Sequence, residues 1–155
     1  MLRNQWLVLA GFILLCLAVG GLGGWVTAQS VVDWYPTLIK PSWNPPNWIF
    51  GPVWTTLYVL MAIAAWLVWR GGGRTGGAMV LFFSQLALNF AWSFLFFGAR
   101  SPWLGLVDIA MLWVALLLTA IAFFQRSRLA GTLMLPYLAW VSFAAVLNFA
   151  IWRLN

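Results

Sequence analysis

Histidine is absent from the 155-residue sequence, and Cys16 is its only cysteine. Zinc sites built from histidine and thiolate ligands are therefore excluded, as are nucleophilic triads that depend on histidine. A single cysteine in an apolar run cannot form a disulfide framework. Only two acids, Asp33 and Asp108, are available for acid–base chemistry. We therefore expect no metal site and no required cofactor.

Charge is the second scarce property. Charged residues make up 6% of the chain and hydrophobic residues 65%, whereas a typical soluble domain is about 25% charged. Most of the surface must therefore face lipid, which predicts an integral membrane protein. The net charge of +6 does not indicate a nucleic-acid partner, because the basic residues occur singly or in pairs and form no phosphate-binding face.

Long apolar runs are abundant. A helix that crosses the hydrocarbon core needs about 20 apolar residues, and these runs lack the alternation of membrane-barrel strands. The sequence predicts an all-α integral membrane protein, a five-helix bundle that forms one domain over residues 1–155 with its termini on opposite sides. A signal peptide is the alternative for the first run, since "VTAQS" offers a cleavage site, but the apolar stretch is longer than usual for one. The predicted spans are about 5–26, 47–69, 77–97, 103–124 and 131–152.

The distribution of arginine and lysine predicts the orientation, because basic residues favour the cytoplasmic side. Five lie on the side of the N-terminus and three on the other side. This count places the N-terminus in the cytoplasm and the first loop outside. The two groups are Arg3, Arg70, Arg74, Arg126 and Arg128, against Lys40, Arg100 and Arg153.

Glycines cluster near the end of the first span, where Gly20 and Gly24 are four residues apart. Small residues at this spacing let helix backbones approach closely in lipid, within a bundle or between subunits. The alternative is a loosened helix end one turn before the loop. The sequence leaves both interpretations open.

The first loop combines prolines with aromatic residues in "WYPTLIKPSWNPPNWIFGPVW" at 34–54. Proline fixes its own φ and favours extended conformations in the preceding residue. Residues 35–46 are therefore predicted to form a stiffened, mostly extended segment, and the second helix to begin at Pro46 or Asn47. A stiff loop loses little entropy when it covers the bundle, so we interpret it as a lid.

Tryptophans fall into three groups by position. Those near span ends are interpreted as interfacial anchors, and those of the loop as part of an ordered cover. Buried indoles need a partner for the N–H group, so tryptophans deep within spans should face other helices or a cavity. The groups are Trp6, Trp25, Trp69, Trp103 and Trp152 at span ends; Trp34, Trp43 and Trp48, with Tyr35, in the loop; and Trp54, Trp92, Trp113 and Trp140 within spans.

Polar residues inside the spans share helix faces. A spacing of four residues places side chains on one face, and polar groups in lipid must find partners. They form either hydrogen bonds between helices or the polar points of a ligand cavity. The residues are Gln85, Asn89 and Ser93 on the third span, and Trp140, Ala144 and Asn148 on the fifth, with Tyr137 nearby.

Asp108 is the only acid within a predicted span. Acids inside the membrane are candidates for a functional role. Asp108 lies near the start of the fourth helix, where the helix dipole favours a negative charge. We expect either a structural pairing with an arginine or a role in ligand or proton binding.

These residues resemble the translocator protein family, also called tryptophan-rich sensory proteins or peripheral-type benzodiazepine receptors. The resemblance covers nearly the whole chain. Its most specific part is the Lys-Pro-x-Trp-x-Pro-Pro core of the first loop, and it also includes "QLALNFAWSFLFFG" at 85–98 and "PYLAWVSFAAVLNFAIWRLN" at 136–155.

The resemblance implies a five-helix bundle, commonly a homodimer, with a ligand cavity under the first loop. It implies binding of porphyrins such as protoporphyrin IX and haem, and of isoquinoline-carboxamide drugs. Animal members also bind cholesterol, but Phe149 stands where their sterol motif has tyrosine, which favours a bacterial-type member. By position, Trp54 and Trp140 match the cavity tryptophans, Asn89 matches a polar cavity residue, and the lid residues are Tyr35, Trp43, Pro45 and Pro46.

The leading functional prediction is a membrane receptor or transporter of tetrapyrroles, linked to tetrapyrrole regulation and stress response. The ligand site is predicted from the residues above, together with Trp92, Tyr137, Ala144 and Asn148, while Lys40 or Arg100 pairs with propionates. An alternative is light-dependent porphyrin degradation assisted by Trp54 and Trp140. A sterol-binding or purely structural membrane protein is a further alternative. A retinal pump is excluded, because the only lysine lies in the loop.

Overall fold

The computed structural model describes residues 2–155, with side chains from Asn4 onward. The side chain of Arg3, which enters the predicted orientation, lies outside the described residues. Long apolar helices dominate the described chain and form an all-α bundle. The helices are α1 (Leu2–Asp33), α2 (Phe50–Arg70), α3 (Gly76–Ser93), α4 (Pro102–Arg126) and α5 (Arg128–Leu154), with short helical segments η1 (Tyr35–Thr37), η2 (Asn47–Ile49) and η3 (Phe94–Gly98).

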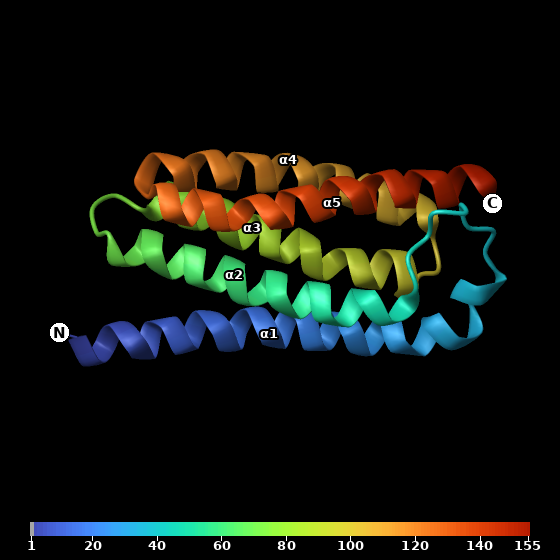
Figure 1. Ribbon diagram of the computed structural model, residues 1–155, viewed down its shortest axis with the longest axis horizontal. Helices are drawn as coiled ribbons and strands as arrows, with labels where there is room; N and C mark the ends of the chain where they lie inside the picture. The colour runs from blue at the N-terminus through green and yellow to red at the C-terminus, as the bar shows by residue number, and fades with distance from the viewer. Residues whose placement is uncertain (1) are drawn as a thin grey trace.

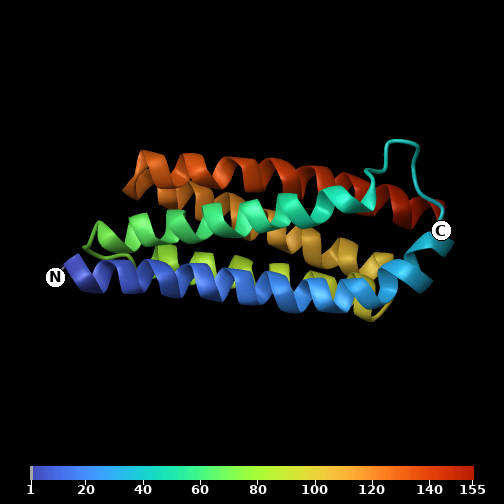
Figure 2. The same cartoon turned by 60° about the horizontal axis from the view of Figure 1, so that its bottom comes forward.

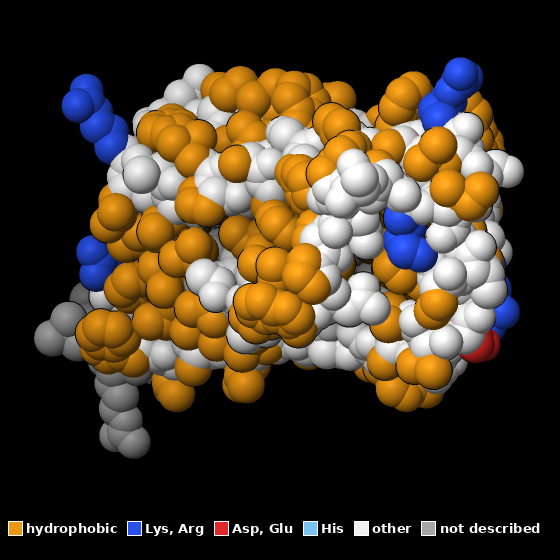
Figure 3. Space-filling view, turned by 45° about the vertical axis from the view of Figure 1, so that its right-hand side comes forward, with side chains coloured by type: hydrophobic (Ala, Val, Ile, Leu, Met, Phe, Trp, Pro, Cys, Tyr) orange, Lys and Arg blue, Asp and Glu red, His pale blue; other side chains and the backbone are white. Residues whose placement is uncertain are grey.

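The five long helices run side by side along the length of the bundle (Figures 1 and 2). The two termini lie at opposite ends, as the sequence predicts (Figure 1). We call the end with residues 34–46 and the C-terminus the loop end, and the end with residues 71–75 the turn end. On the face drawn in Figure 3, hydrophobic side chains cover much of the body, while lysine and arginine lie toward the ends. The predicted five-helix membrane bundle is confirmed.

The helices differ from the predicted spans mainly in α1, which continues to Asp33 rather than ending near residue 26. No proline interrupts residues 26–33, and the added turns have partners on η3. Ser30 Oγ donates to the Phe97 carbonyl at 2.7 Å, and Val26 packs against Gly98. The interpretation of Gly24 as part of a loosened helix end is therefore wrong.

The half of the bundle at the turn end has a solid core. Phe82 of α3 stacks on Phe123 of α4 with ring centroids 6.0 Å apart, and both are fully buried. Trp66 of α2 stacks on Trp6 of α1 and donates to the Gln5 carbonyl at 2.9 Å. This half fixes the relative positions of the helices, while the loop end is hollow.

The end of α3 is a π-helical turn, η3, in which the Ala99 N–H donates to the Phe94 carbonyl at 2.7 Å. The extra residue per turn lets Phe96 and Phe97 both point into the bundle, where each is buried. Such turns often occur at functional sites. The chain then reverses through Arg100, whose φ of 52° is left-handed.

Candidate functional site

A cavity of about 490 Å³ lies inside the loop end, between all five long helices. Ligand pockets typically measure roughly 300–1,000 Å³ and are mostly apolar with a few polar groups. This cavity has that character, because aromatic rings alternate with small residues and no charged side chain is among its described lining residues. Seven of the predicted site residues line it: Tyr35, Trp54, Asn89, Trp92, Trp140, Ala144 and Asn148.

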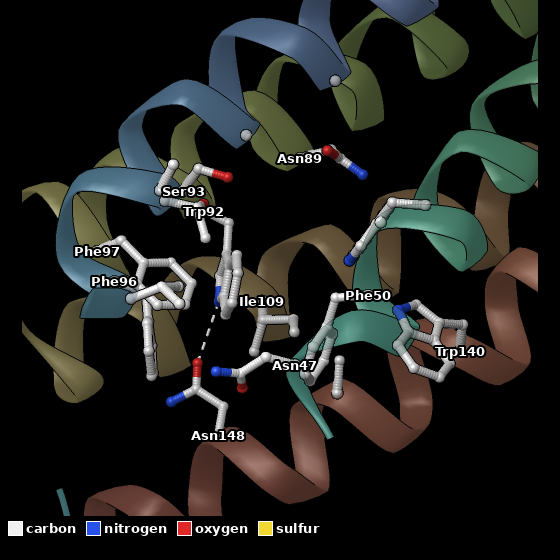
Figure 4. Close-up of a pocket in the computed structure, with 18 of the residues that line it drawn as sticks. Asn47, Phe50, Asn89, Trp92, Ser93, Phe96, Phe97, Ile109, Trp140 and Asn148 are labelled. Atoms are coloured by element: carbon white, nitrogen blue, oxygen red, sulfur yellow. Dashed lines mark hydrogen bonds between the residues drawn. The ribbon is translucent and has the colours of Figure 1, made fainter. Parts of the chain in front are cut away.

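Aromatic rings form its walls (Figure 4). Trp92 of α3 stacks on Phe96 with centroids 4.9 Å apart and an interplanar angle of 19°. On α2, Trp54 lies 5.7 Å from the ring of Tyr58. Both aromatic pairs line the cavity. The sequence prediction omitted Tyr58 and Phe96, although Tyr58 follows Trp54 by four residues and so shares its helix face.

A hydrogen-bonded chain of polar side chains closes the cavity toward the turn end. Tyr58 donates to Asn89 Oδ1 at 2.5 Å, and Asn89 Nδ2 donates to the Tyr137 hydroxyl at 2.5 Å. The Tyr137 hydroxyl in turn donates to Gln85 Oε1 at 2.9 Å. These bonds join α2, α3 and α5, as the interhelical interpretation predicts. Asn89 also lines the cavity, whereas Tyr137 is fully buried behind it.

Asn148 connects three helices at the opposite side of the cavity. It accepts from Trp92 Nε1 at 3.1 Å, the bond drawn in Figure 4, and donates to the Pro102 carbonyl at 2.8 Å. Its close approach to α4 depends on Gly105, where an added Cβ would lie 3.0 Å from Asn148 Oδ1. The indole of Trp92 is therefore held in place by the protein itself.

Trp140 differs from the other deep tryptophans. Trp113 Nε1 donates to Ser142 Oγ at 2.8 Å, whereas the buried Nε1 of Trp140 has no hydrogen-bond partner within the described chain. Figure 4 shows Trp140 beside Phe50, across the cavity from Trp92. A buried N–H group without a partner is costly. The Trp140 ring lines the cavity, but its Nε1 atom is itself buried, so a ligand would reach this donor only after a local rearrangement.

Asp108 is 2% exposed and lies next to the cavity-lining Ile109, but it does not line the cavity itself. Its Oδ2 atom is buried without a hydrogen-bond partner among the described side chains. The one ion pair that the described residues form joins Arg100 to Asp33 at 2.7 Å on the exposed surface. The predicted pairing of Asp108 with an arginine is therefore wrong.

The first loop folds against the loop end of the bundle. Tyr35 is buried against Phe96 and Phe97, and its hydroxyl donates to Asn44 Oδ1 at 3.0 Å. Burial raises the pKa of this hydroxyl above its usual value, an effect that the Asn44 hydrogen bond partly offsets. At the far end of the chain, Asn155 exchanges two hydrogen bonds with the backbone of Ile39.

The remaining predicted loop residues lie outside the cavity lining. Trp43 packs on Phe143 with centroids 5.9 Å apart and is half-exposed, and neither Pro45 nor Pro46 lines the cavity. Residues 38–46 are partly extended, as predicted, but Tyr35–Thr37 form a short 3-10 turn and Asn44 N–H closes a turn on the Pro41 carbonyl.

The two cations predicted to pair with propionates also lie outside the lining. Lys40 Nζ donates to the carbonyls of Tyr35 and Leu38 at 2.8 and 2.9 Å and lies 4.7 Å from the Tyr35 ring centroid. Arg100 is paired with Asp33. Their pairing with a ligand stays a prediction.

Comparison with known proteins identifies the relatives of this chain. The TspO/MBR family matches residues 12–153. The tryptophan-rich protein TspO of Chlorobaculum tepidum is 48% identical over 99% of both chains. The translocator protein of Homo sapiens is 44% identical over 97% of this chain and 91% of its own, and the tryptophan-rich sensory protein of Cereibacter sphaeroides is 38% identical over 99% and 95%. With five apolar helices long enough to cross a membrane, the chain is a multi-pass integral membrane protein and belongs to the TspO/MBR family.

Proposed function

We propose that this protein is a membrane receptor or transporter that binds tetrapyrroles, such as protoporphyrin IX or haem, in the cavity at the loop end. Relatives named translocator protein and sensory protein support a general role of this kind. The observation that favours a planar ligand is the pair of aromatic walls around a cavity of about 490 Å³. Trp54 and Trp92 line it as parts of two aromatic pairs, and Trp140 lines it with an N–H group that has no partner in the described chain.

The polar groups of the ligand are expected at the rim of the cavity. Ionised groups are costly in hydrocarbon unless they are paired, and the described lining provides no charged partner. Propionates would therefore remain near the loop, where Lys40 would have to exchange its carbonyl partners for the ligand. We propose that residues 35–46 act as a lid, held by Tyr35, Lys40 and the Asn155–Ile39 bonds.

Titration of the purified protein with protoporphyrin IX tests this function. Binding should shift the porphyrin absorption band and saturate at micromolar concentration, and a Trp54→Phe/Trp140→Phe double variant should bind more weakly. Absence of a saturable shift would reject tetrapyrrole binding. A cholesterol analogue and an isoquinoline carboxamide, added as competitors of bound protoporphyrin IX, test the other predicted ligands.

A second function is favoured by the position of the same two tryptophans, since Trp54 and Trp140 both border the cavity. A bound porphyrin would absorb light and dioxygen would be the oxidant, so no acid–base pair is needed. Light-dependent loss of the porphyrin band, faster with protein than with detergent alone, would establish this activity. Equal rates would limit the protein to binding.

A further inference from the structure

The exposed part of the cavity lining comes from only two of the helices. Every described lining residue on α3, α4 and α5 is buried or partly buried, including η3. The exposed ones follow one face of α1 and one face of η2–α2, at spacings of three or four residues that keep side chains on one face. They are Leu17, Gly21, Gly24 and Ala28 on α1, and Asn47, Gly51 and Thr55 on η2–α2.

We call the strip between these two helix faces the seam. Within it, α1 and α2 are in close contact at one point. Gly20 packs on the ring of Tyr58, where an added Cβ would lie 2.5 Å from Cε2. Toward the loop end, the lining positions Gly21, Gly24 and Gly51 would each meet nothing within 4 Å if they carried a Cβ. The seam is therefore open at these positions rather than filled by interdigitated side chains.

The loop-end parts of α1 and α2 are held by other neighbours. Ser30 of α1 is bonded to the Phe97 carbonyl of η3. On α2, Phe50 contacts Trp140 of α5 with centroids 5.9 Å apart, and Trp54 contacts Tyr137 at 6.1 Å. The seam can thus stay open while both helices remain anchored.

Exposed tryptophans indicate how deep the seam lies in a bilayer. Trp6 and Trp25 of α1 are 62% and 65% exposed, and at 1.5 Å per residue they stand about 28 Å apart, close to the thickness of the hydrocarbon core. Exposed Trp48 marks the same interface on the second span. Thr55 lies about 10 Å further along the helix. The seam therefore runs from the interface into the acyl-chain region.

We propose that the ligand enters and leaves the cavity from the bilayer, through the seam between α1 and α2. This proposal rests on the proposed function and adds a route and a ligand class: a planar amphiphile that dissolves in lipid. Its apolar ring slides between the helices, while its ionised end stays at the interface near Asn47. The glycines leave space for the ring, and Thr55 satisfies its own hydroxyl by donating to the Gly51 carbonyl at 2.8 Å.

The test is a side chain that fills the seam without disturbing the fold. Gly24→Phe places a ring in the seam from α1, and Thr55→Leu adds bulk from α2. Gly11→Phe is the matched control, because Gly11 is also an exposed α1 glycine whose added Cβ meets nothing within 4 Å, but it lies away from the cavity. Each variant is placed in phosphatidylcholine nanodiscs, and protoporphyrin IX binding is followed by stopped-flow absorption.

Lateral entry predicts that Gly24→Phe lowers the association rate constant at least tenfold relative to Gly11→Phe. Thr55→Leu should also lower this rate constant relative to Gly11→Phe. An association rate equal to that of the control would overturn the route, even if the affinity fell. A wild-type protein that binds no porphyrin would instead reject the proposed function, and the ligand route with it.

Discussion

Replacing Trp140 by phenylalanine tests whether its N–H group serves a ligand rather than the fold. The Trp140 ring borders the cavity, and its Nε1 is buried without a partner in the described structure. Phenylalanine keeps an aromatic wall and removes only the donor and part of the ring. Trp92→Phe is the matched control, because the Trp92 N–H donates to Asn148.

The two substitutions should act on different quantities. A net hydrogen bond is worth about 0.5–1.5 kcal/mol and an orphaned buried polar group costs about 1–3 kcal/mol. Trp140→Phe removes an orphaned donor, which favours the fold, and part of a packed ring, which disfavours it. The free energy of unfolding should therefore change little. Trp140→Phe should weaken binding of a ligand that accepts from the indole by roughly 3- to 10-fold. Trp92→Phe should destabilise the fold by about 1–3 kcal/mol, because it orphans Asn148 Oδ1, which is buried.

Porphyrin absorption in detergent gives the dissociation constant, and thermal unfolding followed by circular dichroism gives the stability. Absorption is preferred to tryptophan fluorescence, because both variants remove a fluorophore. Equal affinity of Trp140→Phe and wild type would refute the assignment of the free donor to the ligand. A loss of stability in Trp140→Phe as large as in Trp92→Phe would show that the N–H has a partner inside the protein.

Three further predictions concern the walls and the loop. Tyr137→Phe should cost about 2 kcal/mol of stability, measured by thermal unfolding, because the hydroxyl makes two buried hydrogen bonds. The effect on porphyrin affinity should be smaller, because these bonds lie behind the cavity. Gly20→Ala should be less stable than Gly21→Ala by about 1–3 kcal/mol, since only the former places a Cβ against Tyr58; equal stabilities would contradict this packing. Burial raises the pKa of the Tyr35 hydroxyl in the folded state. The stabilisation linked to this shift is therefore complete below the unfolded pKa of about 10 and is lost as pH rises through the folded pKa. The difference in tyrosinate absorption between wild type and Tyr35→Phe should show that Tyr35 ionises only above about pH 10.

Much of the fold followed from composition and run length. Apolar runs of about 20 residues can only be spanning helices in a chain with so few charges, and short connections order them into a bundle. The boundary of α1 could not be found this way, because its last turns are stabilised by a distant partner. Ser30 donates to a carbonyl of η3, 67 residues away in sequence. Local sequence contains no signal for that bond.

The candidate site was predictable where one helix face was enough to define it. Asn89 and Trp140 lie at the cavity because their faces point inward. The π-helical turn that directs Phe96 and Phe97 inward was missed, since residue spacing in an α-helix would place them differently. Lys40 was interpreted as a ligand group from its charge alone. The structure shows that carbonyls of its own loop already occupy it, a contact that depends on how the loop turns.

The cavity also has a thermodynamic consequence that connects the site to the seam. Measured cavity costs scale at roughly 24 cal/mol per Å³, so a dry hollow of this size would cost on the order of 12 kcal/mol. That is comparable to the whole stability of a domain, about 5–15 kcal/mol. Lipid, water or ligand must therefore occupy the space. On the proposed route, the exposed lining of α1 and α2 meets the bilayer, so acyl chains are the natural competitor. Ligand affinity should consequently fall in lipids whose acyl chains are more mobile, because these chains compete for the seam. Gly24→Phe should make the affinity less dependent on the lipid.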